Sequence, residues 1–112
     1  MDLTEIESVF NQYYNFLDLK MKAYHFLVEL IQNSQNNFLK EVEDKLTGGM
    51  SLSNFRIEYR NTSLIINDSD LCQSIFRIRF DLINSRTNFQ AFWYDVEYSS
   101  KGEVVDDYFG EY

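Results

Sequence analysis

Few residues of this chain could carry out chemistry. It has one histidine, His25, and one cysteine, Cys72, which are far apart in the sequence. Nucleophilic catalysis needs a base within hydrogen-bond reach of a hydroxyl or thiol, and nothing in the spacing predicts that these two side chains meet. We expect His25 to form an ion pair or buried hydrogen bond with Glu29, one helical turn away, and Cys72 to pack as a small apolar residue. Neither is predicted to be catalytic.

Metal and phosphate sites have no better support. A structural zinc needs about four Cys or His ligands, which is more than the chain holds. Asp68 and Asp70 could bind a divalent cation, but no third acid adjoins them in the sequence. The pair Gly48 and Gly49 is expected to follow a helix, whereas phosphate-binding loops precede one. We therefore predict no catalytic residue, no metal and no cofactor.

The end of the chain concentrates acids and aromatic residues. Residues 95–112 hold six acids and one base, although residues 47–94 hold four acids and five bases. Such a surface repels nucleic acid and anionic lipid and attracts basic proteins, with plain solubility as the alternative explanation. Aromatic anchors supply binding energy at protein interfaces, and complementary charge speeds the encounter. The predicted partner-binding residues are Trp93, Asp95, Glu97, Glu103, Asp106, Asp107, Tyr108, Phe109 and Glu111.

Basic residues share one predicted face of two neighbouring strands, at Arg56, Arg60, Arg77 and Arg79. Together with Trp93 they could bind a single-stranded nucleic acid. Acids are expected on the same face, at Glu58, Asp81, Asp95 and Glu97. Because cross-strand pairs of opposite charge are an ordinary covering for a solvated sheet face, we predict ion pairs there and no nucleic acid binding.

These residues must be positioned by two kinds of element, of which the first is helical. Apolar residues recur at spacings of three and four, and they predict a buried helical stripe at Leu3, Ile6, Phe10, Tyr13, Leu17, Met21, Tyr24, Val28 and Ile31. A second stripe, Phe38, Val42 and Leu46, follows the polar residues 33–37. Either one helix bends at this point or two helices form a hairpin. The glycine pair at 48 and 49 should end the helical part.

From residue 51 the apolar period changes to two, which is typical of strands with one solvated face. Strands are predicted at 54–60, 62–67, 74–82, 88–98 and 103–109, with turns at 61–62 and 67–70. One sheet face should contain Phe55, Ile57, Phe76, Ile78, Phe80, Phe92 and Tyr94. We expect it to pack on Phe10, Tyr13, Leu17, Tyr24 and Val28.

The length favours a single domain over residues 1–112, helical at 1–47 and a β-meander at 51–112. The predicted class is α+β, with an N-terminal helix or helix hairpin packed on a four- to five-stranded antiparallel meander sheet. A single cysteine, an acidic start and the lack of an apolar run of about 20 residues predict a cytoplasmic protein without membrane contact. The sequence does not predict an oligomeric state.

In overall character the chain resembles the immunity proteins of bacterial toxin systems, such as those of contact-dependent growth inhibition. The shared features are small size, acidity, a helical start and a meander that ends in YDVEYSSKGEVVDDYF. The resemblance implies that the protein occludes the surface of a cognate toxin, such as a basic nuclease, and it assigns no site residue. A phage-encoded inhibitor that mimics nucleic acid to block a defence nuclease is an alternative, as are a small enzyme and a structural subunit.

Overall fold

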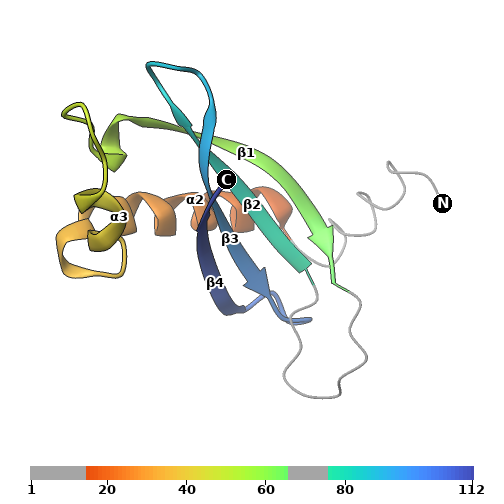
Figure 1. The fold of residues 1–112 in the computed structure, drawn as a ribbon. Helices are drawn as coiled ribbons and strands as arrows, with labels where there is room; N and C mark the ends of the chain where they lie inside the picture. Colours follow the sequence, from red (N-terminus) through yellow and green to blue (C-terminus); the bar gives the residue numbers. More distant parts are fainter. Residues whose placement is uncertain (1–14, 66–75) are drawn as a thin grey trace.

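A computed structural model describes residues 15–65 and 76–112 of the chain and has an α+β fold. Its antiparallel sheet contains β1 (Phe55–Leu64), β2 (Phe76–Asn84), β3 (Gln90–Tyr98) and β4 (Val104–Glu111), in the order β1-β2-β3-β4. Helix α2 (Phe16–Gln32) lies across one face of this sheet (Figure 1). Between α2 and β1 are the short elements η1 (Ser34–Asn36), α3 (Lys40–Asp44) and η2 (Leu52–Asn54). The α+β class and the antiparallel sheet are confirmed.

Helix α2 begins at a side-chain cap and packs through a stripe that differs from the predicted one. The Asn15 side-chain oxygen accepts the N–H of Asp18 at 3.1 Å, which satisfies one free donor of the first turn. Ala23 and Leu27 are fully buried. Leu17, which was expected in the core, is 61% exposed, and Met21 is 51% exposed.

The predicted stripe was only partly right, because this helix is apolar on more than one side. Ile31 packs against the core as expected, but Leu17 and Met21 do not. Leu19, Ala23 and Leu27 follow helical spacing just as Leu17, Met21 and Tyr24 do, so periodicity alone could not choose between the two stripes. Tyr24 is 40% exposed, although the edge of its ring still contacts Phe80. The predicted contacts of Leu3, Ile6, Phe10 and Tyr13 lie outside the described residues.

The polar residues 33–37 end α2 instead of joining two long helices. The Asn33 side-chain amide donates to the Glu29 carbonyl at 2.9 Å, and that of Asn37 donates to the Leu30 carbonyl at 2.8 Å. These bonds satisfy carbonyls that the last turn leaves free. The following helix, α3, has five residues, so the helix hairpin is not confirmed. Gly48 and Gly49 have φ of 66° and 72°, the left-handed conformation expected after the helical part.

The first strand is longer than the sequence predicted. A turn was expected at Asn61 and Thr62, but both belong to β1. Tyr59 lies opposite Phe80 and Asn61 lies opposite Arg79, so one extra residue is inserted between them as a bulge. The bulge keeps Thr62 on the helix side of the sheet, opposite Ile78. A local break in alternation was therefore a bulge and not a turn. Because residues 62–64 belong to β1, a separate fifth strand at 62–67 is not confirmed.

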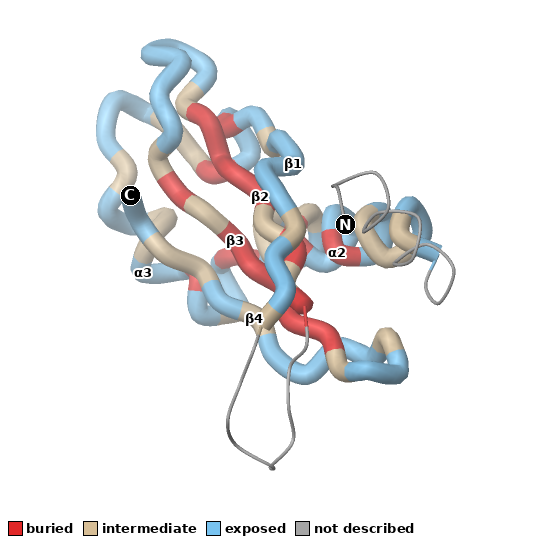
Figure 2. The backbone as a smooth tube through the Cα atoms, turned by 90° about the vertical axis from the view of Figure 1, so that its right-hand side faces the viewer, coloured by how far each residue is buried: buried red, intermediate tan, exposed pale blue. Residues whose placement is uncertain are grey.

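The core lies between α2 and the helix side of the sheet. All the predicted strand residues are buried there except Ile57, which is half-buried and packs against the core. Other alternate positions of β2 and β3 join them, so the buried strand residues are Phe55, Phe76, Ile78, Phe80, Leu82, Phe92, Tyr94, Val96 and Tyr98. Phe80 is 2% exposed. Figure 2 shows that the buried residues of the sheet are concentrated on β2 and β3, whereas β4 is mostly exposed or intermediate. The Tyr98 hydroxyl donates to the Leu19 carbonyl at 3.1 Å and links β3 to α2.

The described helices do not include one that could cross a bilayer, since none within 15–65 and 76–112 is both long and apolar enough.

Candidate functional site

Strand β4 carries most of the predicted binding residues and is an edge strand of the sheet. It pairs with β3 from Phe92 opposite Glu111 to Tyr98 opposite Val104, which confirms a paired last strand. The chain reverses between the two strands where the Ser99 N–H donates to the Glu103 carbonyl at 2.8 Å. Because successive residues of a strand point to opposite faces, β4 divides the predicted residues between two surfaces.

On the face away from α2, acids of β3 are buried under arginines of β2. Asp95 is 2% exposed and holds the Arg79 guanidinium through two bonds, of 2.7 and 2.9 Å. Glu97 is 6% exposed and accepts Arg77 at 2.6 Å. The hydrogen bond to Asp95 raises the pKa of Arg79. Both acids were predicted to bind a partner, but here they are covered and their charges are matched by arginines.

Asp81 completes this layer from the middle of β2. Its carboxylate accepts the Gln90 amide at 2.8 Å and the Tyr112 hydroxyl, and Arg60 lies 3.8 Å away. Arg56 pairs with Glu58 at 2.8 Å. Each of the four arginines thus faces an acid, as predicted. We call Arg77, Arg79, Asp81, Asp95 and Glu97 the ion-pair layer.

Trp93 belongs to the same surface but is held in place on both sides. The Arg79 guanidinium lies over its ring at 4.5 Å from the centroid. A Cβ atom at Gly110 of β4 would lie 2.1 Å from Trp93 Cζ2, so the indole lies directly against the glycine backbone. Nucleic acid stacking requires a free aromatic face, whereas the Trp93 ring is covered by Arg79 and packs against Gly110 of β4.

The acids of β4 and its preceding turn have a different environment. Glu103, Asp106 and Glu111 are exposed and Asp107 is half-buried. Within residues 15–65 and 76–112, none of them forms an ion pair with a Lys, Arg or His side chain. We call these four residues the β4 acids.

Tyr108 is the exposed aromatic residue among the β4 acids. Its side chain is on the face away from α2 and is 45% exposed. The hydroxyl donates to the Asp106 carboxylate at 3.1 Å, and this bond raises the pKa of Tyr108. A large ring beside unpaired carboxylates, at the end of a sheet, is suited to contact a basic protein surface.

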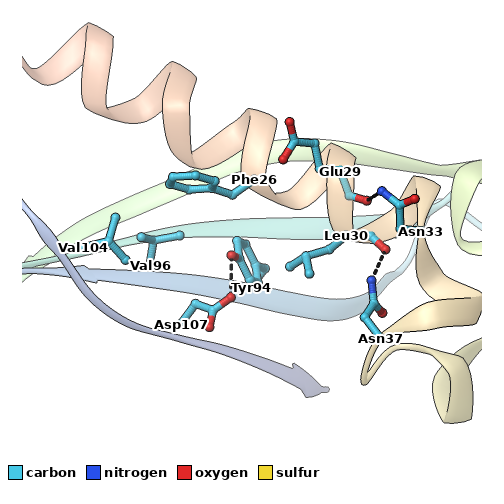
Figure 3. Close-up of a pocket in the computed structure, with 9 residues that line it drawn as sticks. All are labelled: Phe26, Glu29, Leu30, Asn33, Asn37, Tyr94, Val96, Val104 and Asp107. Atoms are coloured by element: carbon cyan, nitrogen blue, oxygen red, sulfur yellow. Dashed lines mark hydrogen bonds between the residues drawn. The ribbon is translucent and has the colours of Figure 1, made fainter.

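On the helix side, a groove of about 440 Å³ lies between α2 and the last two strands (Figure 3). Its lining residues are Phe26, Glu29, Leu30, Asn33, Asn37, Tyr94, Val96, Val104 and Asp107. The buried Tyr94 hydroxyl donates to the Asp107 carboxylate at 2.8 Å. Burial, and then this bond, raise the pKa of Tyr94, so the phenol remains a proton donor. The groove thus combines an apolar floor with two acids and no lysine or arginine.

A second hollow, of about 300 Å³, continues along the helix side of β4 past Phe109. Phe109 is half-buried, and its ring lies 5.5 Å from that of Phe92 and 6.4 Å from that of Phe38. Phe109 therefore packs the residues that precede α3 against the sheet. Glu41, Lys45 and Glu111 lie at this hollow, so here a base accompanies the acids.

Sequence reasoning missed the contribution of α2 to this surface. Phe26, Glu29 and Leu30 line the groove opposite Asp107, but none was predicted to bind a partner. The sequence of the last strand did indicate part of this surface, because alternation places Asp107 and Phe109 on the side of the sheet that faces the helix. The helix residues cannot be inferred from the sequence, because periodicity alone does not identify which apolar side of α2 faces the sheet.

The chemical candidates of the sequence gain no support in the described residues. His25 is exposed and contacts the Tyr24 ring at 5.7 Å, and the part of the chain that is described contains no ion pair between His25 and Glu29. That predicted contact was wrong, because the side chain projects from an exposed side of α2. No group of three metal-ligating side chains occurs within 15–65 and 76–112. Asp68, Asp70 and Cys72 lie outside these ranges.

Comparison with known proteins adds no relative: no family model matches the chain, and neither does any curated protein or solved structure.

Proposed function

We propose that this protein is a small acidic binding protein that neutralises a basic protein partner, a cognate toxin such as a nuclease, by occluding its surface. The observation that carries the proposal is the contrast within one sheet. Acids of the ion-pair layer are matched by arginines, whereas the β4 acids are unpaired among the described residues and accompany the exposed Tyr108. An exposed carboxylate is well solvated by water, and it gains further energy when a complementary basic surface approaches.

The chemistry of the β4 acids also favours a protein over other partners. A net charge of -8 repels nucleic acid and anionic lipid. The pairing of the arginines removes the basic surface that a nucleic acid would need. A toxin that binds nucleic acid must present a basic surface of its own, and the β4 acids would occupy it as phosphates do.

Binding kinetics against the product of the adjacent gene would test the proposal. Asp106→Lys combined with Glu111→Lys should slow association and weaken its salt dependence, because steering reaches about 8–10 Å at ordinary ionic strength. Both side chains are exposed, so the fold should tolerate the change. The control is Asp18→Lys combined with Asp44→Lys. These two substitutions lie on the helices, change the net charge by the same amount as the β4 pair, and disrupt only exposed ion pairs.

Tyr108→Ala should act on the other rate constant. If the ring is a buried anchor in the complex, dissociation should accelerate by about 30-fold, which corresponds to ~2 kcal/mol. If the lysine pair on β4 and the pair on the helices slow association equally, and Tyr108→Ala dissociates as wild type does, then β4 is not the interface.

A further inference from the structure

The outer edge of β4 leaves backbone hydrogen-bonding groups without a strand partner among the described residues. Tyr112 N–H donates to the Ala91 carbonyl of β3 at 3.0 Å. In an antiparallel pair, successive residues alternate between facing the partner strand and facing away from it. Gly110 and Tyr108 therefore also face β3. The backbone groups of Asp107, Phe109 and Glu111 point away from it, along the free edge.

The acids on this edge determine what could pair with it. Open edges invite association with other strands, and charged residues are a common protection against it. A second copy of β4 would bring its own Asp106, Asp107 and Glu111 against the same three acids, so repulsion disfavours an edge-to-edge dimer. The Asp106 carboxylate also accepts the Asp107 N–H at 2.8 Å, which occupies the first outward donor. A strand with basic side chains would instead be attracted to the acids of this edge.

The groove lies beside this edge, on the helix side. A strand added to β4 would place every second side chain on that side, next to Asp107 and Phe109. The Asp107 carboxylate faces the space between β4 and α2, over a floor that includes Leu30 and Val96 (Figure 3). A side chain with an aliphatic stem and a cationic head matches such a site, because its methylenes cover apolar surface while its charge reaches a carboxylate.

We infer that β4 accepts an extended basic segment of the partner as a fifth strand, with an arginine of that segment inserted beside Asp107. The inference rests on the proposed function, because it assumes a basic protein partner. It adds the mode of contact: main-chain hydrogen bonds along Phe109 and Glu111 supply affinity, and the groove selects a cationic side chain.

The test uses a synthetic peptide with alternating arginines, acetyl-Thr-Arg-Val-Arg-Val-Arg-Thr-amide, and its twin in which citrulline replaces each arginine. Titration into the full chain, followed by amide NMR and hydrogen exchange, should slow exchange at Phe109 and Glu111 by about tenfold or more. The citrulline twin keeps the shape and loses the charge, so it should bind about tenfold more weakly. Equal binding of the two peptides would overturn the arginine site.

Glu111→Pro and Glu111→Ala form the decisive pair of variants for strand addition. Proline removes an outward N–H that does not donate to β3, and edge strands tolerate it; alanine removes the same charge and keeps the N–H. Peptide binding should be at least about fivefold weaker in the proline variant than in the alanine variant. Equal affinity in two variants with native NMR spectra would overturn the added strand.

Asp107→Asn tests the groove independently, since an amide oxygen can still accept the Tyr94 hydroxyl. It should weaken the arginine peptide about tenfold and leave the citrulline peptide unchanged, whereas the control Asp44→Asn should change neither. If toxin association depends on the β4 acids but neither peptide protects the amides of Phe109 and Glu111, the proposed function stands and this inference is wrong. If the peptide binds as described and the toxin ignores β4, the edge site stands and the proposed function is wrong.

Discussion

Strands β3 and β4 are hydrogen-bonded neighbours and both are rich in acids, but their carboxylates differ in burial and in ion pairing. Asp95 on β3 is 2% exposed and is held by two arginines, at 2.7 and 3.5 Å. Asp106 and Glu111 on β4 are exposed and form no ion pair within the described residues. Strand β3 is flanked by β2, which supplies the arginines, and by β4, which helps to cover its acids, whereas β4 has a neighbour on one side only and that neighbour carries no arginine. The position in the sheet, and not the residue type, separates acids that stabilise the fold from acids available to a partner.

The largest expected effect comes from the core on which both groups of acids rest. Phe80→Ala should lower the free energy of unfolding by ~3–5 kcal/mol, because it leaves a cavity against Tyr24 and Tyr59. Urea unfolding would measure it and would give the scale for the smaller effects below. A loss of unfolding free energy below about 1 kcal/mol would mean that the neighbouring side chains relax into the cavity, so that the packing of α2 on β2 does not depend on Phe80.

Asp95→Asn and Asp106→Asn test the comparison itself with the same chemical change. At Asp95 the variant leaves Arg79 and Arg77 with less counter-charge in a covered site, so we expect a loss of about 1–3 kcal/mol. Asp106 is exposed, and in the asparagine variant the amide oxygen can still accept the Asp107 N–H while the amide NH2 donates to the Tyr108 hydroxyl, so we expect a change within about 0.5 kcal/mol. Urea midpoints with unchanged slopes would measure both. Equal losses would contradict the distinction between the ion-pair layer and the β4 acids.

A smaller effect should appear at alkaline pH, where Tyr94 links the core to Asp107. Burial raises the pKa of Tyr94 above its ordinary value of 10, and burial raises that of Tyr98 to about 12. Above about pH 10 the native state therefore holds these protons more tightly than the unfolded chain, and stability falls as pH rises. Tyr94→Phe removes one such group and should flatten the decline between about pH 10 and pH 11.5. Thermal unfolding as a function of pH would measure it, and a slope identical to wild type would mean that Tyr94 ionises freely in the folded protein.

Much of the sheet could be predicted from sequence because its rule is simple. Phe76, Ile78 and Phe80 alternate with charged residues, and this pattern fixes which face is buried. The same alternation correctly predicted that the arginines of β2 would meet acids. The alternation does not distinguish the bulge at Arg60 from a turn, since both interrupt a period of two. The buried stripe of α2 was misassigned because Leu17 and Leu19 fit a period of 3.6 equally well.

The candidate site was harder to predict than the fold because burial of an acid depends on its neighbours across the sheet. Asp95 and Asp106 look alike in sequence, and both lie in acidic, aromatic surroundings. Their difference arises from the register, which places Arg79 opposite Asp95 and leaves β4 at the end. The groove also needs Phe26 and Leu30 from α2. These residues are far from β4 in the sequence, so no local sequence pattern predicts that they meet it.

The strand order β1-β2-β3-β4 has a kinetic consequence. Every strand pairs with the one that precedes it in the chain, so each closure joins segments that are close in sequence and loses little chain entropy. Proteins dominated by such contacts reach their folding transition state quickly for a β-rich topology. Strand β4 contributes no fully buried residue, so β1, β2 and β3 can form a hairpin and then a three-stranded sheet around the core before β4 docks. The strand that carries the unpaired acids would then be the last to dock, onto a sheet whose core is already closed.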